Sequence, residues 1–251
     1  MGILTGKVAI VTGGARDIGR QVSLKLAAEG ARVCINYFGE KNGAEETFQS
    51  ITSAGGEAII IQGDMTKQAD VAKVVGACVA SFGETIDILV NVAGGIVGRK
   101  LLPDMDENFW DFVMNVNLKS VFLVTQAVVS HMTNGGSIVN FSSQAARDGG
   151  GFGAMAYSTA KGAVLTFTRG LAKELGPKGI RVNCISPGMI NTTFHNTFTK
   201  DEVRKNVAAS TPLRREGDPS EIGDLALYLS SNASSFITGS SIEINGGTYF
   251  V

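Results

Sequence analysis

The chain has 251 residues, of which 44% are hydrophobic, 22 are basic and 23 are acidic, for a formal net charge of −1. Interspersed charges of this kind offer no basic surface to nucleic acid or to an anionic membrane, so we expect a small-molecule substrate and neither of those partners. No apolar run is expected to span a membrane, two histidines are too few for a metal centre, and three scattered cysteines indicate a reduced, cytoplasmic protein.

Short apolar runs alternate with segments of helical periodicity along the whole chain. The expected strands are 7–12, 31–37, 58–62, 86–91, 137–141, 181–185 and 241–244. The expected helices are 20–29, 44–54, 68–82, 107–131 (one long helix or two abutting ones), 156–175, 201–208 and one that begins at 218. This alternation predicts a single α/β domain over 1–251, a Rossmann-like doubly wound parallel sheet of about seven strands with helices on both faces. Ligands bind such sheets beyond the carboxyl ends of the strands.

A glycine-rich turn lies between the first expected strand and the first expected helix. It reads Thr12-Gly13-Gly14-Ala15-Arg16-Asp17-Ile18-Gly19. A turn of this kind lets backbone N–H groups meet a pyrophosphate at a helix N-terminus, so it predicts a dinucleotide site. The alternative is a tight strand-to-helix turn with a structural role only.

Tyr157 and Lys161 are four residues apart in an expected helix, which places them on one face. A free phenol titrates near pH 10, and a fixed ammonium beside it favours the phenolate. The pair therefore predicts a tyrosine tuned for proton transfer, because such groups work best with a pKa near the working pH. An ordinary surface tyrosine and lysine would give the same spacing, so the motif gains weight only from its neighbours.

Further motifs follow in a fixed order. They are Asp64 after the third strand, Asn91-Val92-Ala93-Gly94, Asn117-Leu118-Lys119, Ser142-Ser143, and Pro187-Gly188 with Ile190 and Thr192. Together with the glycine turn and the Tyr157–Lys161 pair, they make the whole chain resemble the short-chain dehydrogenase/reductase family. Asp17 and Val92 depart from the family pattern, which usually has glycine and asparagine at these two positions.

The resemblance implies hydride transfer between a nicotinamide and a carbonyl or alcohol. The catalytic residues that it implies are Asn117, Ser143, Tyr157 and Lys161, with Asn117 positioning a water. The cofactor contacts that it implies are Gly13, Arg16, Asp17, Ile18, Gly19, Asn36, Tyr37, Asp64, Met65, Asn91, Ala93, Gly94, Tyr157, Lys161, Pro187, Gly188, Ile190 and Thr192. Plainer alternatives remain: Asn117 could cap or kink a helix. Ser142 could replace Ser143, and Asp64 could only stabilise a turn.

The end of the second strand bears on the choice of cofactor. An acid there would bond the ribose 2′-hydroxyl of NAD and repel a 2′-phosphate. The chain has no acid in this stretch before Glu40, whereas Arg16 and Lys41 are cations that could meet a phosphate. We therefore predict NADP(H) as the preferred cofactor, with NAD(H) as the alternative.

Cations on three loops of the active edge bear on the substrate. The predicted substrate contacts are Arg99, Lys100, Ser143, Gln144, Arg147 and His195. The last of these, His195, belongs to an expected substrate loop or lid at about 188–212. Four cations favour an anionic carbonyl compound, because a guanidinium pairs bidentately with a carboxylate. The runs Gly94–Lys100 and Thr192–His195 resemble reductases that convert 4-deoxy-5-keto-uronates to 2-keto-3-deoxy-gluconate in alginate breakdown. Solvent-exposed charge on loop tips is the plainer alternative.

Two other functions stay open. The C-terminal half resembles 3-oxoacyl carrier-protein reductases, for which Arg214-Arg215 or Arg169 with Lys173 would offer a basic docking surface. A cofactor-binding redox sensor without chemistry is the third alternative. The resemblance also implies a homotetramer or a dimer, packed through 107–131 and 156–175.

Overall fold

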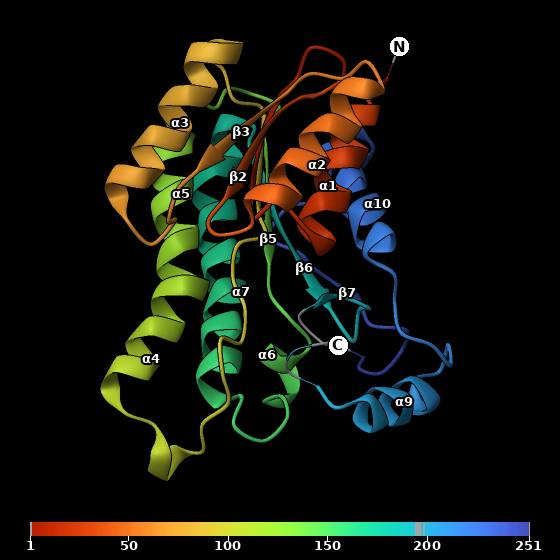
Figure 1. Cartoon of the computed structure of the whole chain (residues 1–251). Helices are drawn as coiled ribbons and strands as arrows, with labels where there is room; N and C mark the ends of the chain where they lie inside the picture. The colour runs from red at the N-terminus through yellow and green to blue at the C-terminus, as the bar shows by residue number, and fades with distance from the viewer. Residues whose placement is uncertain (1, 194–196, 198, 251) are drawn as a thin grey trace.

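The computed structural model describes residues 2–193, 197 and 199–250. In this part of the chain, seven parallel strands form one sheet in the order β3-β2-β1-β4-β5-β6-β7 (Figure 1). The strands are β1 (Val8–Thr12), β2 (Arg32–Tyr37), β3 (Ala58–Gln62), β4 (Ile88–Asn91), β5 (Ser137–Phe141), β6 (Arg181–Pro187) and β7 (Ser241–Ile244). The order reverses between β1 and β4, and a sheet of this kind has its ligand crevice at such a point. The predicted fold class is confirmed.

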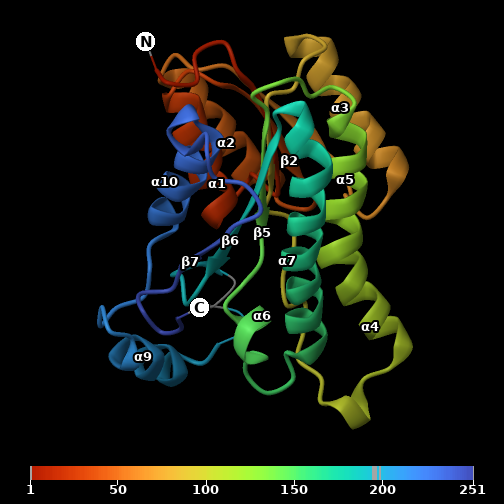
Figure 2. The same ribbon diagram turned by 180° about the vertical axis from the view of Figure 1, so that it is seen from behind.

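Helices cover both faces of the sheet (Figures 1 and 2). One face carries α1 (Asp17–Ala28), α2 (Lys41–Ser53) and α10 (Pro219–Ser230), and the other carries α3 (Gln68–Phe82), α4 (Glu107–Met114), α5 (Ser120–Val129) and α7 (Met155–Leu175). All five side chains of β1 are buried, as expected for a strand sandwiched between two helical layers. Smaller helices are α6 (Ala145–Asp148) and α9 (Asp201–Ser210), with 3-10 turns at Leu102–Asp104, Gly176–Lys178 and Asn232–Ser234.

A π-helical turn, Asn115–Lys119, joins α4 to α5. At this turn the Asn117 side chain donates to the carbonyl oxygen of Val113, four residues earlier, at 3.0 Å. The segment expected as one long helix or two abutting ones is thus one continuous helical element of 23 residues, Glu107–Val129, whose most apolar 18-residue window has a mean hydropathy of 1.5. By length and composition alone this element could cross a membrane, which is weak evidence when it is one helix of the described chain. By packing, this element is a core helix of the domain, with α5 against α3 and α4 against α7.

Candidate active site

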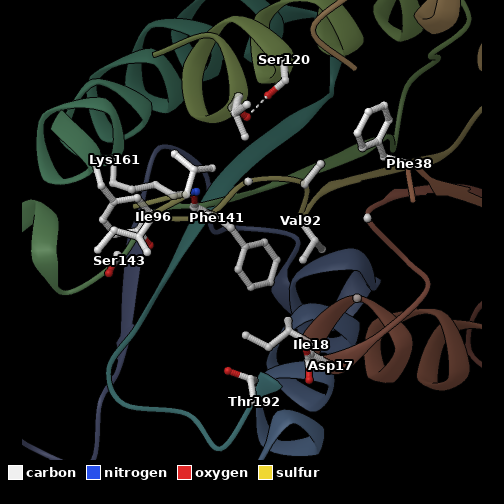
Figure 3. Close-up of a pocket in the computed structure, with 18 of the residues that line it drawn as sticks. Asp17, Ile18, Phe38, Val92, Ile96, Ser120, Phe141, Ser143, Lys161 and Thr192 are labelled. Carbon is white, nitrogen blue, oxygen red and sulfur yellow. Dashed lines mark hydrogen bonds between the residues drawn. The ribbon is translucent and has the colours of Figure 1, made fainter. Parts of the chain in front are cut away.

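A cavity of about 670 Å³ runs along the carboxyl end of the sheet, and the loops after β1 to β6 line it (Figure 3). Every predicted cofactor contact lines this cavity except Asn91. The Asn91 side chain is buried and donates to Asn140 Oδ1 at 2.9 Å and Thr125 Oγ1 at 3.2 Å, and a cofactor contact of this residue stays a prediction. Asn91 braces β4 against β5 and so fixes the loop that follows it.

The glycine turn after β1 is shaped by close backbone approach. A Cβ on Gly19 would collide with the carbonyl oxygen of Gly13, so this position has room for glycine only. Gly13 has φ of 63° and Asp17 has φ of 48°, both left-handed. The family's usual glycine at the second position suits this conformation, and aspartate is among the few other residues that adopt it. The departure at Asp17 therefore keeps the backbone shape and adds a carboxylate.

The adenosine end of the cavity carries an unexpected acid. Glu40 lines it together with Phe38, and Arg16 Nη1 lies 3.6 Å from Glu40 Oε1. Lys41 instead pairs with Glu45 at 3.4 Å and does not line the cavity. From the sequence, Glu40 lies too far beyond β2 to be expected at the cofactor. In the structure, the loop after Tyr37 folds so that Glu40 lines the cavity.

Asp64 follows β3 and lines the same end of the cavity. Its Oδ1 accepts bonds from the backbone N–H of Thr66 at 2.9 Å and from the Thr66 hydroxyl at 2.7 Å. The residue therefore stabilises the turn and faces the cavity at once, so the two alternatives for it coexist.

Ser143 and Lys161 lie together at the opposite end of the cavity (Figure 3). Tyr157 also lines the cavity and joins them there. Tyr157 and Lys161 share one face of α7, with Lys161 Nζ 5.8 Å from the centre of the Tyr157 ring. Tyr157 is hydrogen-bonded to Ser143. The Ser142 hydroxyl donates to the Lys161 carbonyl at 2.8 Å, so it is used to dock α7 on β5. The geometry therefore favours Ser143 over Ser142 for chemistry.

Burial controls the protonation of this group. Burial raises the pKa of Tyr157, and the bond with Ser143 offsets this in part. Burial also lowers the pKa of Lys161 to about 8, and its ammonium donates to the Phe141 carbonyl at 2.9 Å. The lowering of the tyrosine pKa by Lys161 that the spacing predicts is not seen here, because the two influences on the pKa of Tyr157 are its burial, which raises it, and the bond with Ser143, which lowers it. Tyr157 is a protonated phenol at neutral pH, ready to donate.

Asn117 lies beside this group but does not line the cavity. Its Oδ1 accepts from the backbone N–H of Gly95 at 2.9 Å, and its Nδ2 donates to the Gly95 carbonyl at 2.8 Å. A Cβ on Gly94 would lie 2.8 Å from Asn117 Oδ1 and 3.2 Å from Lys161 Nζ, so the three groups are closely packed. The side-chain amide therefore fastens the loop after β4 to the π-turn, and a water contact of Asn117 remains a prediction.

The predicted substrate contacts divide into two groups. Arg99 and Ser143 line the cavity, and His195 lies outside the described residues. Lys100, Gln144 and Arg147 do not line it, so a contact of these three with a substrate stays a prediction. Each is held by an acid instead: Lys100 by Asp106 at 2.6 Å, Gln144 by Asp148 at 2.9 Å and Arg147 by Glu243 at 3.1 Å.

Sequence reasoning missed an apolar wall at the substrate end. Ile96, Val97, Phe112, Val116 and Ala154 line the cavity next to Ser143 and Tyr157. Phe112 and Val116 are one turn apart where α4 passes into the π-turn, a spacing that alone is indistinguishable from that of core residues. The wall forms where α4 packs beside the loop after β4, and the sequence alone does not predict that packing.

Comparison with known proteins agrees with this geometry. A family model described as enoyl-(acyl carrier protein) reductase matches residues 13–249. The 3-oxoacyl-(acyl-carrier-protein) reductase FabG of Staphylococcus epidermidis (strain RP62A) is 37% identical over 245 residues, 97% of this chain and 99% of that protein. A short-chain dehydrogenase/reductase from Serratia marcescens BCRC 10948 superposes with a TM-score of 0.92 at 34% identity, covering 97% and 98% of the two chains.

A third relative has a bound nucleotide. A blue fluorescent protein from a metagenomic library, solved in complex with NADPH, superposes with a TM-score of 0.92 at 33% identity, covering 98% and 99% of the two chains. With this fold, cavity and cluster of Ser143, Tyr157 and Lys161, the chain belongs to the short-chain dehydrogenase/reductase family. It is an NAD(P)-dependent oxidoreductase, and its long cavity with the glycine turn at one side fits such a cofactor.

Proposed function

We propose that the protein reduces the carbonyl group of an anionic sugar acid, a keto- or aldehydo-uronate, with NADP(H) preferred over NAD(H). The observation that carries the substrate class is Arg99. Among the charged residues of the described lining, Arg16, Asp17, Glu40 and Asp64 lie on the loops after β1 to β3, whereas Arg99 and Lys161 lie at the substrate end. Arg99 is thus the one lining cation there outside the catalytic group, within the described part of the chain.

The guanidinium of Arg99 has capacity for a carboxylate. Its Nη1 donates to the carbonyl oxygen of Phe152 at 3.1 Å, which holds the side chain between the loop after β4 and the loop after α6. A guanidinium has five N–H donors, and this bond uses one of them. A substrate carboxylate there would accept a charge-assisted hydrogen bond, and its carbonyl would extend toward Ser143 and Tyr157.

The residues at the reacting carbonyl have separate roles. A reduced nicotinamide bound in the cavity would supply the hydride that the carbonyl carbon accepts. Tyr157 gives its phenolic proton to the carbonyl oxygen, so that the product is an alcohol. Ser143 donates a hydrogen bond to the same oxygen as negative charge develops on it. The Lys161 ammonium then stabilises the phenolate that Tyr157 becomes.

A 3-oxoacyl carrier-protein reductase is the second candidate. The similarity to FabG supports it, and the apolar wall beside Ser143 would suit an acyl chain. The predicted basic docking surface supports it less. Arg215 pairs with Glu221 at 2.6 Å, and Arg214 donates to the Ala209 carbonyl, whereas Arg169 and Lys173 are exposed on α7.

A panel of carbonyl compounds distinguishes the two candidates. It contains 4-deoxy-5-keto-uronate, its uncharged analogue, an acetoacetyl thioester and simple sugars. We expect the uronate to give the highest kcat/KM. Arg99→Ala should lower this kcat/KM by a factor that corresponds to about 1.5–3 kcal/mol of transition-state stabilisation, the value of a hydrogen bond to a charged group. The matched control is Lys100→Ala on the same loop, which should leave it unchanged. If the thioester is preferred, or if Arg99→Ala leaves uronate turnover intact, the acyl reductase is the better assignment.

The proposed NADP(H) preference depends on two opposed groups at the ribose end. Arg16 is the cation for a 2′-phosphate, and its partner Glu40 would repel that phosphate or bond a 2′-hydroxyl. Their side chains are 56% and 59% exposed, so the ion pair is weak and a phosphate can displace it. We therefore propose a modest preference, with both cofactors accepted.

The proposal includes a homotetramer or dimer in the cytoplasm. Its support is the surface of the two long helical elements, where Phe122 on α5 and Met155 on α7 are exposed and do not line the cavity. Burial of these side chains against a second copy would be favourable. Light scattering at micromolar concentration tests this, and a monomer would contradict it.

A further inference from the structure

A bidentate contact joins two distant loops at the edge of the cavity. Asp17 Oδ1 accepts a hydrogen bond from the backbone N–H of Thr193 at 3.0 Å, and Asp17 Oδ2 accepts one from the Thr193 hydroxyl at 2.5 Å. The two residues are 176 positions apart in the chain. We call this contact the Asp17–Thr193 clasp.

The clasp connects two sides of the dinucleotide cavity. On one side, the turn after β1 contributes Gly13 and Ile18 to the lining, and on the other the segment after β6 contributes Ile190 and Thr192. Figure 3 shows Asp17, Ile18 and Thr192 next to one another at this border. A dinucleotide lying along the cavity therefore passes between two segments that the clasp ties together.

A cation lies beside the clasp. Arg16 Nη1 donates to the Thr193 hydroxyl at 3.3 Å, and Arg16 Nε lies 3.9 Å from Asp17 Oδ2. The carboxylate thus has a cation beside it, which limits its repulsion of an anionic ligand in the cavity.

The left-handed backbone conformation of Asp17 also indicates that its side chain has a role. A residue with a Cβ at φ of 48° carries a steric cost that glycine avoids. Backbone strain of this kind persists where other interactions compensate for it. Apart from the neighbouring Arg16, the contacts of the Asp17 carboxylate in the described structure all go to Thr193. The carboxylate therefore provides a contact between the two loops that a glycine cannot make.

We propose that Asp17 is a positioning residue, which holds the segment after β6 against the phosphate-binding turn and so slows the release of the bound dinucleotide. Release requires the two sides of the cavity to separate, and separation breaks both bonds of the clasp. Because the bonds are solvent-exposed, we discount the value of a charge-assisted hydrogen bond and expect release about fivefold faster without the clasp. The inference concerns the cofactor alone and holds whichever carbonyl compound is the substrate.

The test is a double-mutant cycle on the dissociation rate of NADPH, followed by displacement in a stopped-flow fluorimeter. Asp17→Gly removes both bonds and suits the left-handed backbone. Thr193→Val removes the hydroxyl bond while keeping the shape of the side chain. We expect about fivefold faster release for Asp17→Gly, about twofold for Thr193→Val, and no further change when both are combined. Thr193→Ser keeps the hydroxyl and should release NADPH at the original rate.

Two measurements separate the clasp from other roles of these residues. The same acceleration is expected with NADH, because the clasp does not touch the 2′ position, and this separates the inference from the proposed NADP(H) preference. Asp17→Asn keeps an acceptor oxygen for the backbone N–H of Thr193 and should lie between the original protein and Asp17→Gly.

Three results would overturn the proposal. One is an unchanged release rate in Asp17→Gly, even if its melting temperature without cofactor falls, since that describes a structural link only. Another is slower release, which would mean that the carboxylate acts by repelling the pyrophosphate. The third is additive effects of Asp17→Gly and Thr193→Val, which would mean that the two residues act separately.

Discussion

Replacing Lys161 by methionine should change the pH dependence of stability in a defined direction. Burial lowers the pKa of Lys161 from 10.5 to about 8 in the folded chain. Between these values the unfolded chain binds one proton more at this site, so the stability of the original protein rises with pH. A shift of this size corresponds to about 3 kcal/mol in total, of which about 2.5 kcal/mol falls between pH 7 and pH 10. The variant Lys161→Met lacks this contribution.

The assay is urea unfolding of both proteins at pH 7 and pH 10. The stability of Lys161→Met relative to the original should be greater at pH 7 than at pH 10 by about 2.5 kcal/mol. Loss of the bond to the Phe141 carbonyl lowers the variant's stability as well, so the change with pH is the test and not the absolute difference. Lys173→Met, an exposed lysine on the same helix, is the control and should show no such change. A constant difference between Lys161→Met and the original protein across this range would refute the reasoning.

Three further substitutions test other parts of the site. Asn117→Ala removes the two bonds to Gly95 and the bond to the Val113 carbonyl of α4, and urea unfolding should show a loss of about 2–4 kcal/mol. Arg147→Met leaves the Glu243 carboxylate, whose side chain is only 10% exposed, without its ion pair. Its melting temperature should fall, and Glu243→Gln in the same chain should restore it. Arg16→Ala should raise KM for NADPH about fivefold more than KM for NADH, and Glu40→Gln should have the opposite effect. Equal changes with both cofactors would contradict the last of these.

The elements of the fold could be predicted from local pattern. Strands buried on both faces are continuous apolar runs, and β1, β3 and β5 lie within a residue of their expected bounds. Helix starts were less accurate, since α1 and α2 each begin three residues earlier than expected. The start of α1 is governed by the left-handed backbone of Asp17, a feature that the sequence alone does not state.

The catalytic end of the site followed from motif spacing, whereas the partners of charged side chains did not. Tyr157 and Lys161 are one helical turn apart, so their common face is fixed by the period of the helix. Arg147 lies four residues past Ser143 but is paired with Glu243, which is 96 positions away on β7. Ion pairs of this kind depend on the register of strands that are distant in sequence. No local sequence pattern predicts that register. The same holds for Asp17 and Thr193.

The measurement that tests the central claim most directly is single-turnover reduction by the variant Tyr157→Phe. Phenylalanine keeps the ring in its place on α7 and removes only the hydroxyl that donates the proton. We predict that the variant binds NADPH with unchanged Kd while the rate of hydride transfer falls by about 10²–10⁴-fold, the usual contribution of a positioned proton donor. Retention of most of that rate with normal NADPH binding would contradict the assignment of Tyr157 as the proton donor.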